Sequence, residues 1–224
     1  MSLLVVTSVA AERAAILAAL PDQATSFAVG AQAAARPGGI TVLLGGVGPV
    51  ASAAAASAAL ATGDYELVIG AGIGGGFEPV GVGAIAVAST IAFADLGAET
   101  DAGFVQLSSL GFGTDHYEVA PQLAIELTDR AGGHLGTILT VATVTGTTAT
   151  AHGLRGRYPH AVAEGMEGAG IAAAATLHGV PFAEVRAISN PVGPRNRDTW
   201  RIPEALAALG RALAAITVAP LEIR

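Results

Sequence analysis

The sequence predicts an α/β protein in which helices cover both faces of a central sheet that is mixed but largely parallel. Short apolar runs alternate with helical stretches along the chain, the pattern of strand–helix–strand units. Thirty glycines and abundant alanine, with only 4% aromatic residues, indicate layers that pack closely. The chain of 224 residues shows no internal repeat and is long enough for one sizeable core. We therefore expect three layers in a single domain over residues 1–224.

The first elements alternate as such a fold requires. Leu3–Val6 is a short apolar run typical of a buried strand, and the helical stretch Ala10–Leu20 after it is ended by Pro21. A second apolar run, Ile40–Leu44, predicts the next strand. A glycine-rich turn then leads into the alanine-rich helix Pro49–Ala61, because proline is favoured at the first helical position.

The middle of the chain contains two more strands. Leu67–Ile69 is a buried strand that runs into the glycine cluster Gly70–Gly76, and Ala84–Phe93 is a longer one. Residues 97–118 have no clear periodicity, so we expect a loop or flap there. Pro121–Arg130 has the pattern of a helix.

The last third continues the alternation. Thr137–Val144 predicts a strand, and a short helix is expected over Thr148–Arg155. Glu167–His178 is predicted to be a helix, Phe182–Ile188 a strand, and Pro203–Ile216 the closing helix.

Charge and composition exclude several classes of function. The net charge of −7 argues against a nucleic-acid partner, since that needs a cationic face. Every basic residue is arginine, which excludes a lysine Schiff base and a P-loop of the usual form. Cysteine is absent, so disulfides, a thiol nucleophile and thiolate metal sites are excluded, which fits a cytoplasmic protein.

Membrane and metal sites are not expected either. The uncharged stretch between Arg36 and Asp64 is interrupted by glycines and a proline between Gly45 and Pro49, so it does not predict a membrane span. Met1–Val9 lacks a basic region and is not a signal peptide. The five histidines lack the spacing of metal ligands, so we expect no metal.

The glycine cluster admits three interpretations. Gly70–Gly75 formally matches the dinucleotide motif G-x-G-x-x-G, and Asp95 follows at about twenty residues. That motif must open a helix, whereas Phe77–Gly83 has turn chemistry and leads into another strand. We favour a wall of glycines that lets a flat ring or a sugar approach the backbone, and a structural bulge is the alternative. The glycines expected in the wall are Gly72, Gly74 and Gly75.

Five motifs together carry a family resemblance. They are Val9–Glu12, Gly45–Gly48, Gly70–Gly76, Gly165–Gly168 and Arg186–Asn190. In this order and spacing the chain resembles the superfamily of purine nucleoside phosphorylases and methylthioadenosine/S-adenosylhomocysteine nucleosidases, over nearly its whole length. Within it, the chain is most similar to the futalosine hydrolase family, which serves an alternative menaquinone pathway. The resemblance implies a nucleoside phosphorylase-like fold, cleavage of an N-glycosidic bond, a small nucleoside substrate and no cofactor.

The resemblance also assigns roles to charged residues. Glu12 matches the carboxylate that activates the attacking water, although alone it reads as a first-turn glutamate favoured by the helix dipole. Glu167 matches the ligand of the ribose hydroxyls, with Met166 against the sugar. Bonds to such a carboxylate can strengthen as the sugar gains oxocarbenium character. Arg186 matches a residue near the water and the sugar, and an arginine paired with a buried acid is the alternative.

Asn190 occupies the position of the leaving base. Nucleosidases that act on adenine compounds carry aspartate there, which can protonate N7 and accept from the exocyclic amine. An amide instead donates to O6 or N7 of a 6-oxopurine. Asn190 therefore favours a hypoxanthine or guanine leaving group, with a turn-capping role before Pro191 as the alternative.

The expected nucleophile is water. Phosphorylases of the superfamily hold phosphate with arginines, one of them shortly before the glycine cluster. Here no arginine or lysine occurs from Pro37 to Asp129, and Gly70–Ala71 stands in the required place. A phosphate dianion without its arginines is poorly held.

The segment Pro191–Trp200 resembles the futalosine hydrolases most specifically. We expect a loop over the site, with Trp200 on the ribose 5′ side. Arg195 or Arg197 is expected to pair with the carboxylate of the benzoate-like 5′ group of futalosine, and a solvated basic loop is the alternative.

Other positions complete or depart from the family pattern. Val144 stands where relatives stack a phenylalanine on the base, and Thr145 is expected to supply a backbone contact instead. Ile73 replaces a serine of some relatives, and Gly165 replaces an acidic residue. The flap, residues 97–118, is expected to complete the 5′ pocket, across a dimer interface as in relatives. We therefore expect a homodimer or higher homo-oligomer.

The predicted function is hydrolysis of futalosine to hypoxanthine and dehypoxanthine futalosine. The alternatives are a methylthioadenosine/S-adenosylhomocysteine or aminofutalosine nucleosidase, and a purine nucleoside phosphorylase. A nucleoside-binding module without catalysis is a third, disfavoured because Glu12 and Glu167 are both present.

Overall fold

One mixed sheet forms the centre of the molecule. The computed structural model describes residues 2–20, 25–29, 32–36 and 39–221. The strands of the sheet are β1 (Leu3–Thr7), β2 (Thr25–Val29), β3 (Gln32–Arg36), β4 (Ile40–Leu44), β5 (Leu67–Gly76), β6 (Ile85–Phe93), β9 (His116–Glu118), β10 (His134–Thr140), β11 (Ala161–Gly165) and β12 (Phe182–Pro191). Their order is β11-β10-β6-β12-β5-β1-β4-β3-β2, with β9 beside β6.

The centre of the sheet consists of two parallel blocks joined by antiparallel pairs, and β2, β3 and β9 are antiparallel additions at its margins. Strands β4, β1, β5 and β12 are parallel neighbours, as are β6, β10 and β11. Strand β12 runs antiparallel to β6, and β11 runs antiparallel to β5. Because β11 pairs with both β10 and β5, these strands together with β6 and β12 close into a ring.

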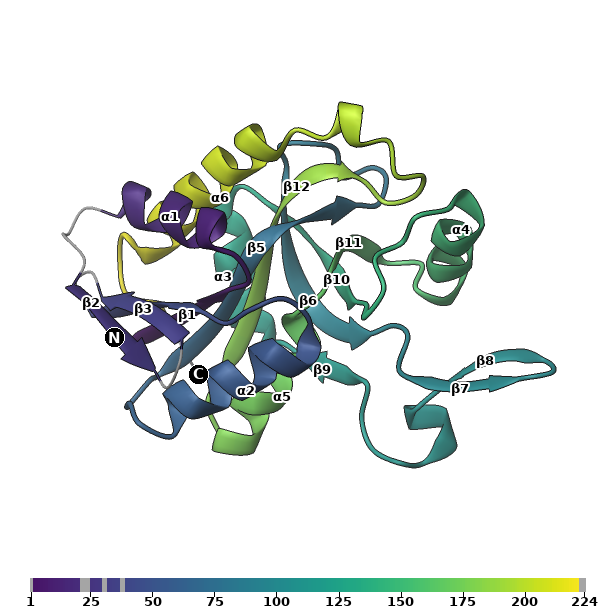
Figure 1. Cartoon of the computed structure of the whole chain (residues 1–224), viewed down its shortest axis with the longest axis horizontal. Helices are drawn as coiled ribbons and strands as arrows, with labels where there is room; N and C mark the ends of the chain where they lie inside the picture. The colour runs from purple at the N-terminus through teal and green to yellow at the C-terminus, as the bar shows by residue number, and fades with distance from the viewer. Residues whose placement is uncertain (1, 21–24, 30–31, 37–38, 222–224) are drawn as a thin grey trace.

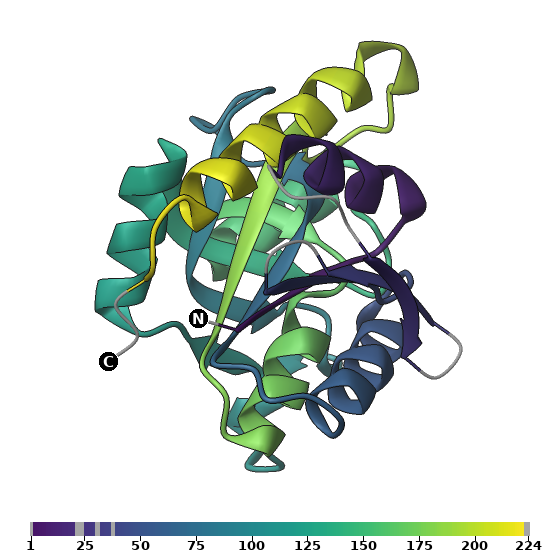
Figure 2. The same ribbon diagram turned by 90° about the vertical axis from the view of Figure 1, so that its left-hand side faces the viewer.

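Helices cover both faces, as Figures 1 and 2 show. They are α1 (Ala10–Ala19), α2 (Pro49–Leu60), α3 (Pro121–Ala131), α4 (Thr148–Arg157), α5 (Gly168–His178) and α6 (Ile202–Thr217). Helix α6 packs against α1 and α3 on one face, while α2 packs against α5 on the other. The side chains of β1 alternate between two cores, since Leu3 and Val5 belong to the first and Leu4 and Val6 to the second. The predicted three-layer α/β architecture is confirmed.

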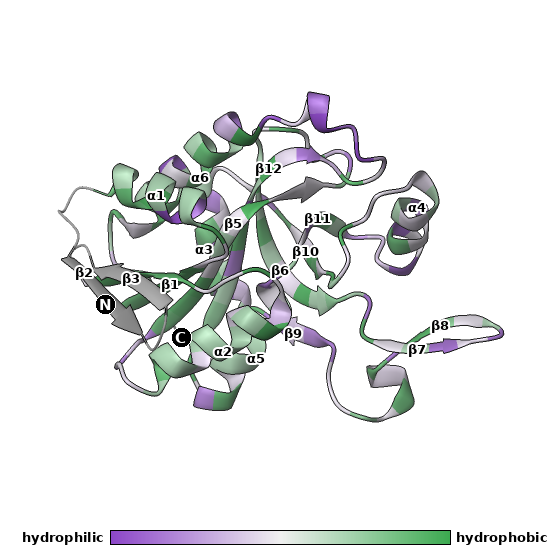
Figure 3. Cartoon of the chain, in the orientation of Figure 1, coloured by the Kyte–Doolittle hydropathy of each residue, from purple (hydrophilic) through white to green (hydrophobic). Residues whose placement is uncertain are grey.

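Small residues allow the helices to approach closely. A Cβ atom on Gly170 of α5 would lie 2.1 Å from the Pro49 carbonyl oxygen of α2, so only glycine fits there. Helix α5 ends at His178 and is capped by Gly179, whose φ of 67° is the left-handed conformation that favours glycine at this position. In Figure 3 the central strands are largely apolar, whereas the segment between β12 and α6 is hydrophilic.

Several elements differ from the sequence predictions. Strands β2, β3 and β11 were not predicted, and the strand predicted over Leu67–Ile69 continues through the whole glycine cluster as β5. The cluster stays extended because β12 and β11 both pair with it. The flap contains the hairpin β7 (Gly97–Thr100) and β8 (Gly103–Gln106), the short helix η1 (Ser108–Leu110), and β9. The hairpin projects from the body of the molecule (Figure 1).

Strand β10 also ends earlier than predicted, at Thr140 instead of Val144. The carboxylate of Asp95 accepts hydrogen bonds from the backbone N–H groups of Ala142 and Thr143 and holds them in a loop. Asp95 therefore serves this loop, and no helix follows the glycine cluster, so the dinucleotide interpretation has no structural support. Pro21 lies outside the described residues, and α1 ends at Ala19. Within the described ranges, no helix has the length and hydropathy needed to cross a bilayer.

Candidate active site

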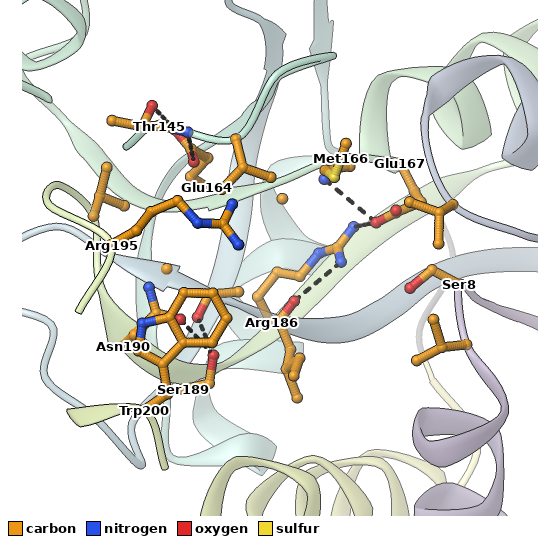
Figure 4. A pocket seen from close by; sticks show the side chains of 18 of the residues that line it. Ser8, Thr145, Glu164, Met166, Glu167, Arg186, Ser189, Asn190, Arg195 and Trp200 are labelled. Atoms are coloured by element: carbon orange, nitrogen blue, oxygen red, sulfur yellow. Dashed lines mark hydrogen bonds and ion pairs between the residues drawn. The ribbon is translucent and has the colours of Figure 1, made fainter. Parts of the chain in front are cut away.

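A pocket lies where the carboxyl ends of four strands meet (Figure 4). Strands β1, β5, β11 and β12 all end there, and loops after β10 and β12 complete the wall. The carboxyl ends of strands are the usual place for ligands in such α/β sheets. The pocket brings together most of the predicted site residues. These are Glu12, Gly74, Gly75, Val144, Thr145, Met166, Glu167, Arg186, Asn190, Arg195 and Trp200.

Glu12 is fixed by the junction between β1 and α1. Its Oε2 accepts hydrogen bonds from the Ser8 N–H at 2.9 Å, the Ser8 hydroxyl at 2.7 Å and the Val9 N–H at 3.2 Å. Its Oε1 accepts from the Ile73 N–H at 2.8 Å. Glu12 thus caps the first turn of α1, as expected of a glutamate favoured by the helix dipole. It also lines the pocket, as the family resemblance implies.

Arg186 is the buried centre of a carboxylate cluster. Its Nε lies 2.8 Å from Glu184 Oε1, and its Nη2 lies 2.9 Å from Glu167 Oε2. Burial disfavours its charge, but the carboxylates of Glu184, Glu167 and Glu12 outweigh this and raise the pKa of Arg186. Arg186 therefore stays cationic, and it both pairs with buried acids and lines the pocket.

Glu184 was not singled out in the sequence. Burial raises the pKa of its carboxyl group above the ordinary value, and Arg186 only partly opposes this. Its Oε2 is buried without a hydrogen-bond partner, against the first residue of α5. In the predicted strand Glu184 shares one face with Phe182, Arg186 and Ile188, so two opposite charges lie next to each other between large apolar side chains, and this was the available signal.

Glu167 is anchored immediately before α5. Its Oε1 accepts a hydrogen bond from the Gly48 N–H at 3.1 Å, and Ser52 donates to its carbonyl oxygen. Only 5% of Glu167 is exposed, and that surface lines the pocket beside Met166. The glycine turn after β4 therefore positions this carboxylate from across the sheet.

Gly72 does not line the pocket but lies behind it. A Cβ atom on Gly72 would lie 2.7 Å from Glu12 Oε1 and 2.7 Å from Arg186 Nη1. The absence of a side chain at this position is what lets the carboxylate and the guanidinium converge. Gly74 and Gly75 line the pocket directly, and each is also crowded by neighbouring atoms.

A β-bulge aims Asn190 at the pocket. Ile188 of β12 pairs with Gly74 and Asn190 pairs with Gly75, so Ser189 is the extra residue. The Ser189 hydroxyl donates to Asn190 Oδ1 at 2.8 Å, and Asn190 Nδ2 donates to the Pro191 carbonyl at 2.9 Å. Asn190 makes the local bond expected of a turn residue, and one hydrogen of its amide is still available to a ligand.

Sequence reasoning missed a third acid in the pocket, besides Glu12 and Glu167. Glu164, at the end of β11, accepts hydrogen bonds from the Thr145 N–H at 2.9 Å and from the Thr145 hydroxyl. Burial raises the pKa of Glu164, although the bonds from Thr145 oppose this shift. A carboxylate in a short apolar run, directly before the Gly165–Gly168 motif, was the available signal. Ser8 was also missed. Other lining residues belong to the motifs or to the predicted covering segment but were given no role individually, and they are Val9, Val47, Ser189, Val192, Gly193 and Pro194.

The segment after β12 covers one side of the pocket. The guanidinium groups of Arg195 and Arg197 lie 5.3 and 5.7 Å from the centre of the Trp200 ring. Trp200 and Arg195 line the pocket, whereas Arg197 does not. The flap, residues 97–118, contributes no residue to the lining of the pocket in its own chain. Its side chain Phe112 is instead 78% exposed. The described residues contain no cluster of metal-ligating side chains.

Comparison with known proteins identifies the class. The family model of the phosphorylase superfamily matches residues 3–221. The chain therefore belongs to the phosphorylase superfamily. A relative from Streptomyces coelicolor, named futalosine hydrolase, is 50% identical over 217 residues, 93% of this chain and 92% of the relative. Another of that name, from Acidothermus cellulolyticus, is 46% identical over 96% of this chain and 90% of its own. Within the superfamily the chain belongs to the futalosine hydrolase family.

Solved structures agree on the fold. The 5′-methylthioadenosine/S-adenosylhomocysteine nucleosidase of Neisseria meningitidis, in complex with methylthio-immucillin-A, has a TM-score of 0.82 at 19% identity, covering 96% of this chain and 98% of its own. The futalosine hydrolase of Helicobacter pylori has a TM-score of 0.84 at 16% identity, covering 96% and 97%. At such identities the similarity concerns the fold alone.

Proposed function

We propose that this chain hydrolyses the N-glycosidic bond of futalosine and releases hypoxanthine. The observation that carries the proposal is the division of one pocket into two ends. The carboxylate of Glu167 lies beside Arg186 at one end, and the amide of Asn190 lies at the other (Figure 4). Glu12 lines the same pocket and approaches Arg186 over Gly72. The curated relatives named futalosine hydrolase support the choice of substrate.

In this proposal Glu12 is the general base. Its Oε1 accepts one hydrogen bond, from Ile73, so a second lone pair is available for a water molecule. Glu12 removes a proton from the water, whose oxygen forms a bond to C1′ of the ribose. The C1′–N9 bond breaks, and its electron pair leaves with the purine. The purine anion takes up a proton from solvent to become hypoxanthine, and Glu12 returns the proton it removed to solvent. Glu167 accepts the ribose hydroxyls, and these bonds strengthen as positive charge develops on the sugar.

Asn190 stabilises the departing base. The purine carries negative charge as it leaves, and a donor at O6 or N7 lowers the energy of that state. Ser189 holds the Asn190 carbonyl oxygen and Pro191 accepts one amide hydrogen, which leaves the second N–H of the amide for the ligand. Val144, Gly74 and Gly75 provide the apolar and backbone surfaces against which the flat base lies in this proposal.

The charges of the pocket support water rather than phosphate as the nucleophile. Among the described lining residues, the arginines are Arg186 and Arg195. Arg186 is already engaged by Glu184 and Glu167. A phosphate dianion beside it would face the repulsion of these acids and of Glu12. Arg195 lies on the segment that covers the pocket, beside Trp200.

The 5′ substituent is proposed to meet Trp200 and Arg195. Arg195 is the loop arginine that lines the pocket, so it is the better candidate for the substrate carboxylate than Arg197. We also propose a homo-oligomer in which the flap of one copy completes the 5′ pocket of another. Light scattering of the purified protein tests this, and a monomer would contradict it.

Product analysis tests the proposed function. The protein is incubated with futalosine, inosine and 5′-methylthioadenosine in phosphate-free buffer, and the released base is quantified by chromatography. Hypoxanthine from futalosine, without added phosphate, is the expected result. Adenine from methylthioadenosine in preference to hypoxanthine from futalosine would contradict it, as would a requirement for phosphate.

A further inference from the structure

Glu164 and Asn190 flank the same glycine. In the pairing of β11 with β5, Glu164 is opposite Gly75, and in the pairing of β12 with β5, Asn190 is opposite Gly75. Residues directly opposite one another project from the same face of a sheet. Neighbouring strands lie about 4.8 Å apart, so the two Cα atoms are roughly 10 Å apart. Between them Gly75 has no side chain, and the space that one would fill is taken by Val192 Cγ2 and the amide of Asn190.

The two polar groups differ in hydrogen-bonding character. The Asn190 amide offers an N–H donor, because its oxygen is held by Ser189. Glu164 offers carboxylate oxygens, and both line the same pocket. Figure 4 shows Thr145, Glu164 and Asn190 on one side of Arg186, with Ser8 and Glu167 on the other. The acceptor and the donor are therefore both at the end of the pocket assigned to the base.

The surroundings of Glu164 leave it with unused acceptor capacity. It is 5% exposed, and its protein hydrogen bonds come from the Thr145 N–H and hydroxyl. Among the described residues it forms no ion pair. A carboxylate has about four lone-pair sites, so a further donor can be accepted. Burying a carboxylate without a cation is costly, and an added donor from a ligand offsets part of that cost.

The C6 edge of the purine supplies a matching donor. In hypoxanthine N1 carries a hydrogen and C6 carries an acceptor oxygen. In adenine N1 is an acceptor and the C6 amine is a donor. We propose that Glu164 accepts the N1–H of the purine, while Asn190 donates to the base, so that the pair selects a 6-oxopurine over a 6-aminopurine. This inference rests on the proposed function and adds a specificity residue on β11.

This pairing of donor and acceptor distinguishes hypoxanthine from adenine in two ways, by attracting the first base and repelling the second. Hypoxanthine satisfies both side chains, whereas adenine would direct the lone pair of N1 at the Glu164 carboxylate. Sites built to hydrogen-bond a polar group reject analogues strongly, because the protein group is left unpaired. A loss of at least about tenfold in the hypoxanthine-to-adenine affinity ratio is expected when Glu164 is changed to glutamine, since one oxygen becomes a donor.

Binding of the free bases tests the inference directly. Calorimetry measures the dissociation constants of hypoxanthine and adenine for the wild-type protein, Glu164→Gln and Thr145→Val. Wild type is expected to prefer hypoxanthine, and Glu164→Gln to lose at least about tenfold of that preference. Thr145→Val removes one anchor of Glu164 but keeps the carboxylate, so most of the preference is expected to survive.

Two outcomes would overturn the inference. An unchanged affinity ratio in Glu164→Gln would show that the carboxylate does not read the base. Loss of the preference in Thr145→Val to the same extent as in Glu164→Gln would mean that Glu164 only positions the loop of Thr145. Circular dichroism melting confirms that each variant is folded.

Futalosine turnover in the same preparations separates this inference from the proposed function. A wild-type protein that prefers hypoxanthine through Glu164 but does not cleave futalosine would contradict the proposed function and support the role of Glu164. Cleavage of futalosine by the wild-type protein, with an unchanged base preference in Glu164→Gln, would support the proposed function and contradict the role of Glu164.

Discussion

Replacing Gly72 by alanine should impair catalysis although Gly72 does not line the pocket. The new Cβ would lie 2.7 Å from both Glu12 Oε1 and Arg186 Nη1, whereas ordinary contact begins at 3.4 Å. The difference, 3.4 minus 2.7, means that each atom must retreat by about 0.7 Å. Neither can do so freely, because Glu12 is held by Ile73 and Ser8, and Arg186 is held by two acids.

A displacement near 1 Å in a catalytic group can cost about 10²-fold in rate, so kcat for futalosine should fall by about that factor. Overpacking should also reduce stability by about 1–3 kcal/mol. Steady-state kinetics and thermal melting measure both effects. Gly81→Ala is the matched control, because a Cβ there meets no atom within 4 Å. A Gly72→Ala variant with wild-type kcat would refute the reasoning that Glu12 and Arg186 must converge.

Three further predictions concern other parts of the site. Asn190→Asp should shift base release towards 6-aminopurines, because aspartate accepts from an exocyclic amine, and competition between futalosine and its 6-amino analogue measures the shift. Arg195→Ala should raise KM for futalosine but not for inosine, because Arg195 lines the pocket. Arg197 does not line it, so Arg197→Ala should change KM for either substrate little, and an equal rise of KM for futalosine in both variants would contradict this assignment. Because the folded-state pKa of Glu184 is raised above its ordinary 4.5, the folded protein binds the extra proton, and stability should decline as pH rises through that raised pKa. Glu184→Gln should flatten this decline in urea unfolding measured across pH, and an unchanged profile would contradict the assignment.

Periodicity was sufficient to predict most of the strands and helices. The run Leu3–Val6 is buried on both faces of the sheet, which makes it continuously apolar. Phe182–Ile188 is equally buried but is interrupted by the paired charges of Glu184 and Arg186. Strand β11 was missed because it is short and contains a carboxylate. The early end of β10 depends on Asp95, a residue distant in sequence whose hydrogen bonds to the backbone cannot be read from a local pattern.

In the site, too, local motifs predicted some residues, whereas others depend on contacts between distant parts of the chain. The family motifs predicted Glu12, Glu167, Arg186 and Asn190, and the fold brings all of them to one pocket. The bulge at Ser189, which aims Asn190, follows from the register of β12 on β5 and has no local signature. Glu164 is close to Asn190 only because β11 closes the ring of strands onto β5.

The role of Glu12 is the central claim, and a single substitution tests it most directly. Glu12→Gln keeps the size of the side chain and an acceptor oxygen for the helix cap but removes the base, so kcat for hypoxanthine release from futalosine should fall by at least about 10²-fold. Ser8→Ala is the companion variant, because it removes one hydrogen bond to Glu12 while keeping the carboxylate, and its loss should be much smaller. Folded Glu12→Gln that binds hypoxanthine normally but no longer releases it from futalosine would agree with the account. Folded Glu12→Gln with a wild-type kcat would contradict it.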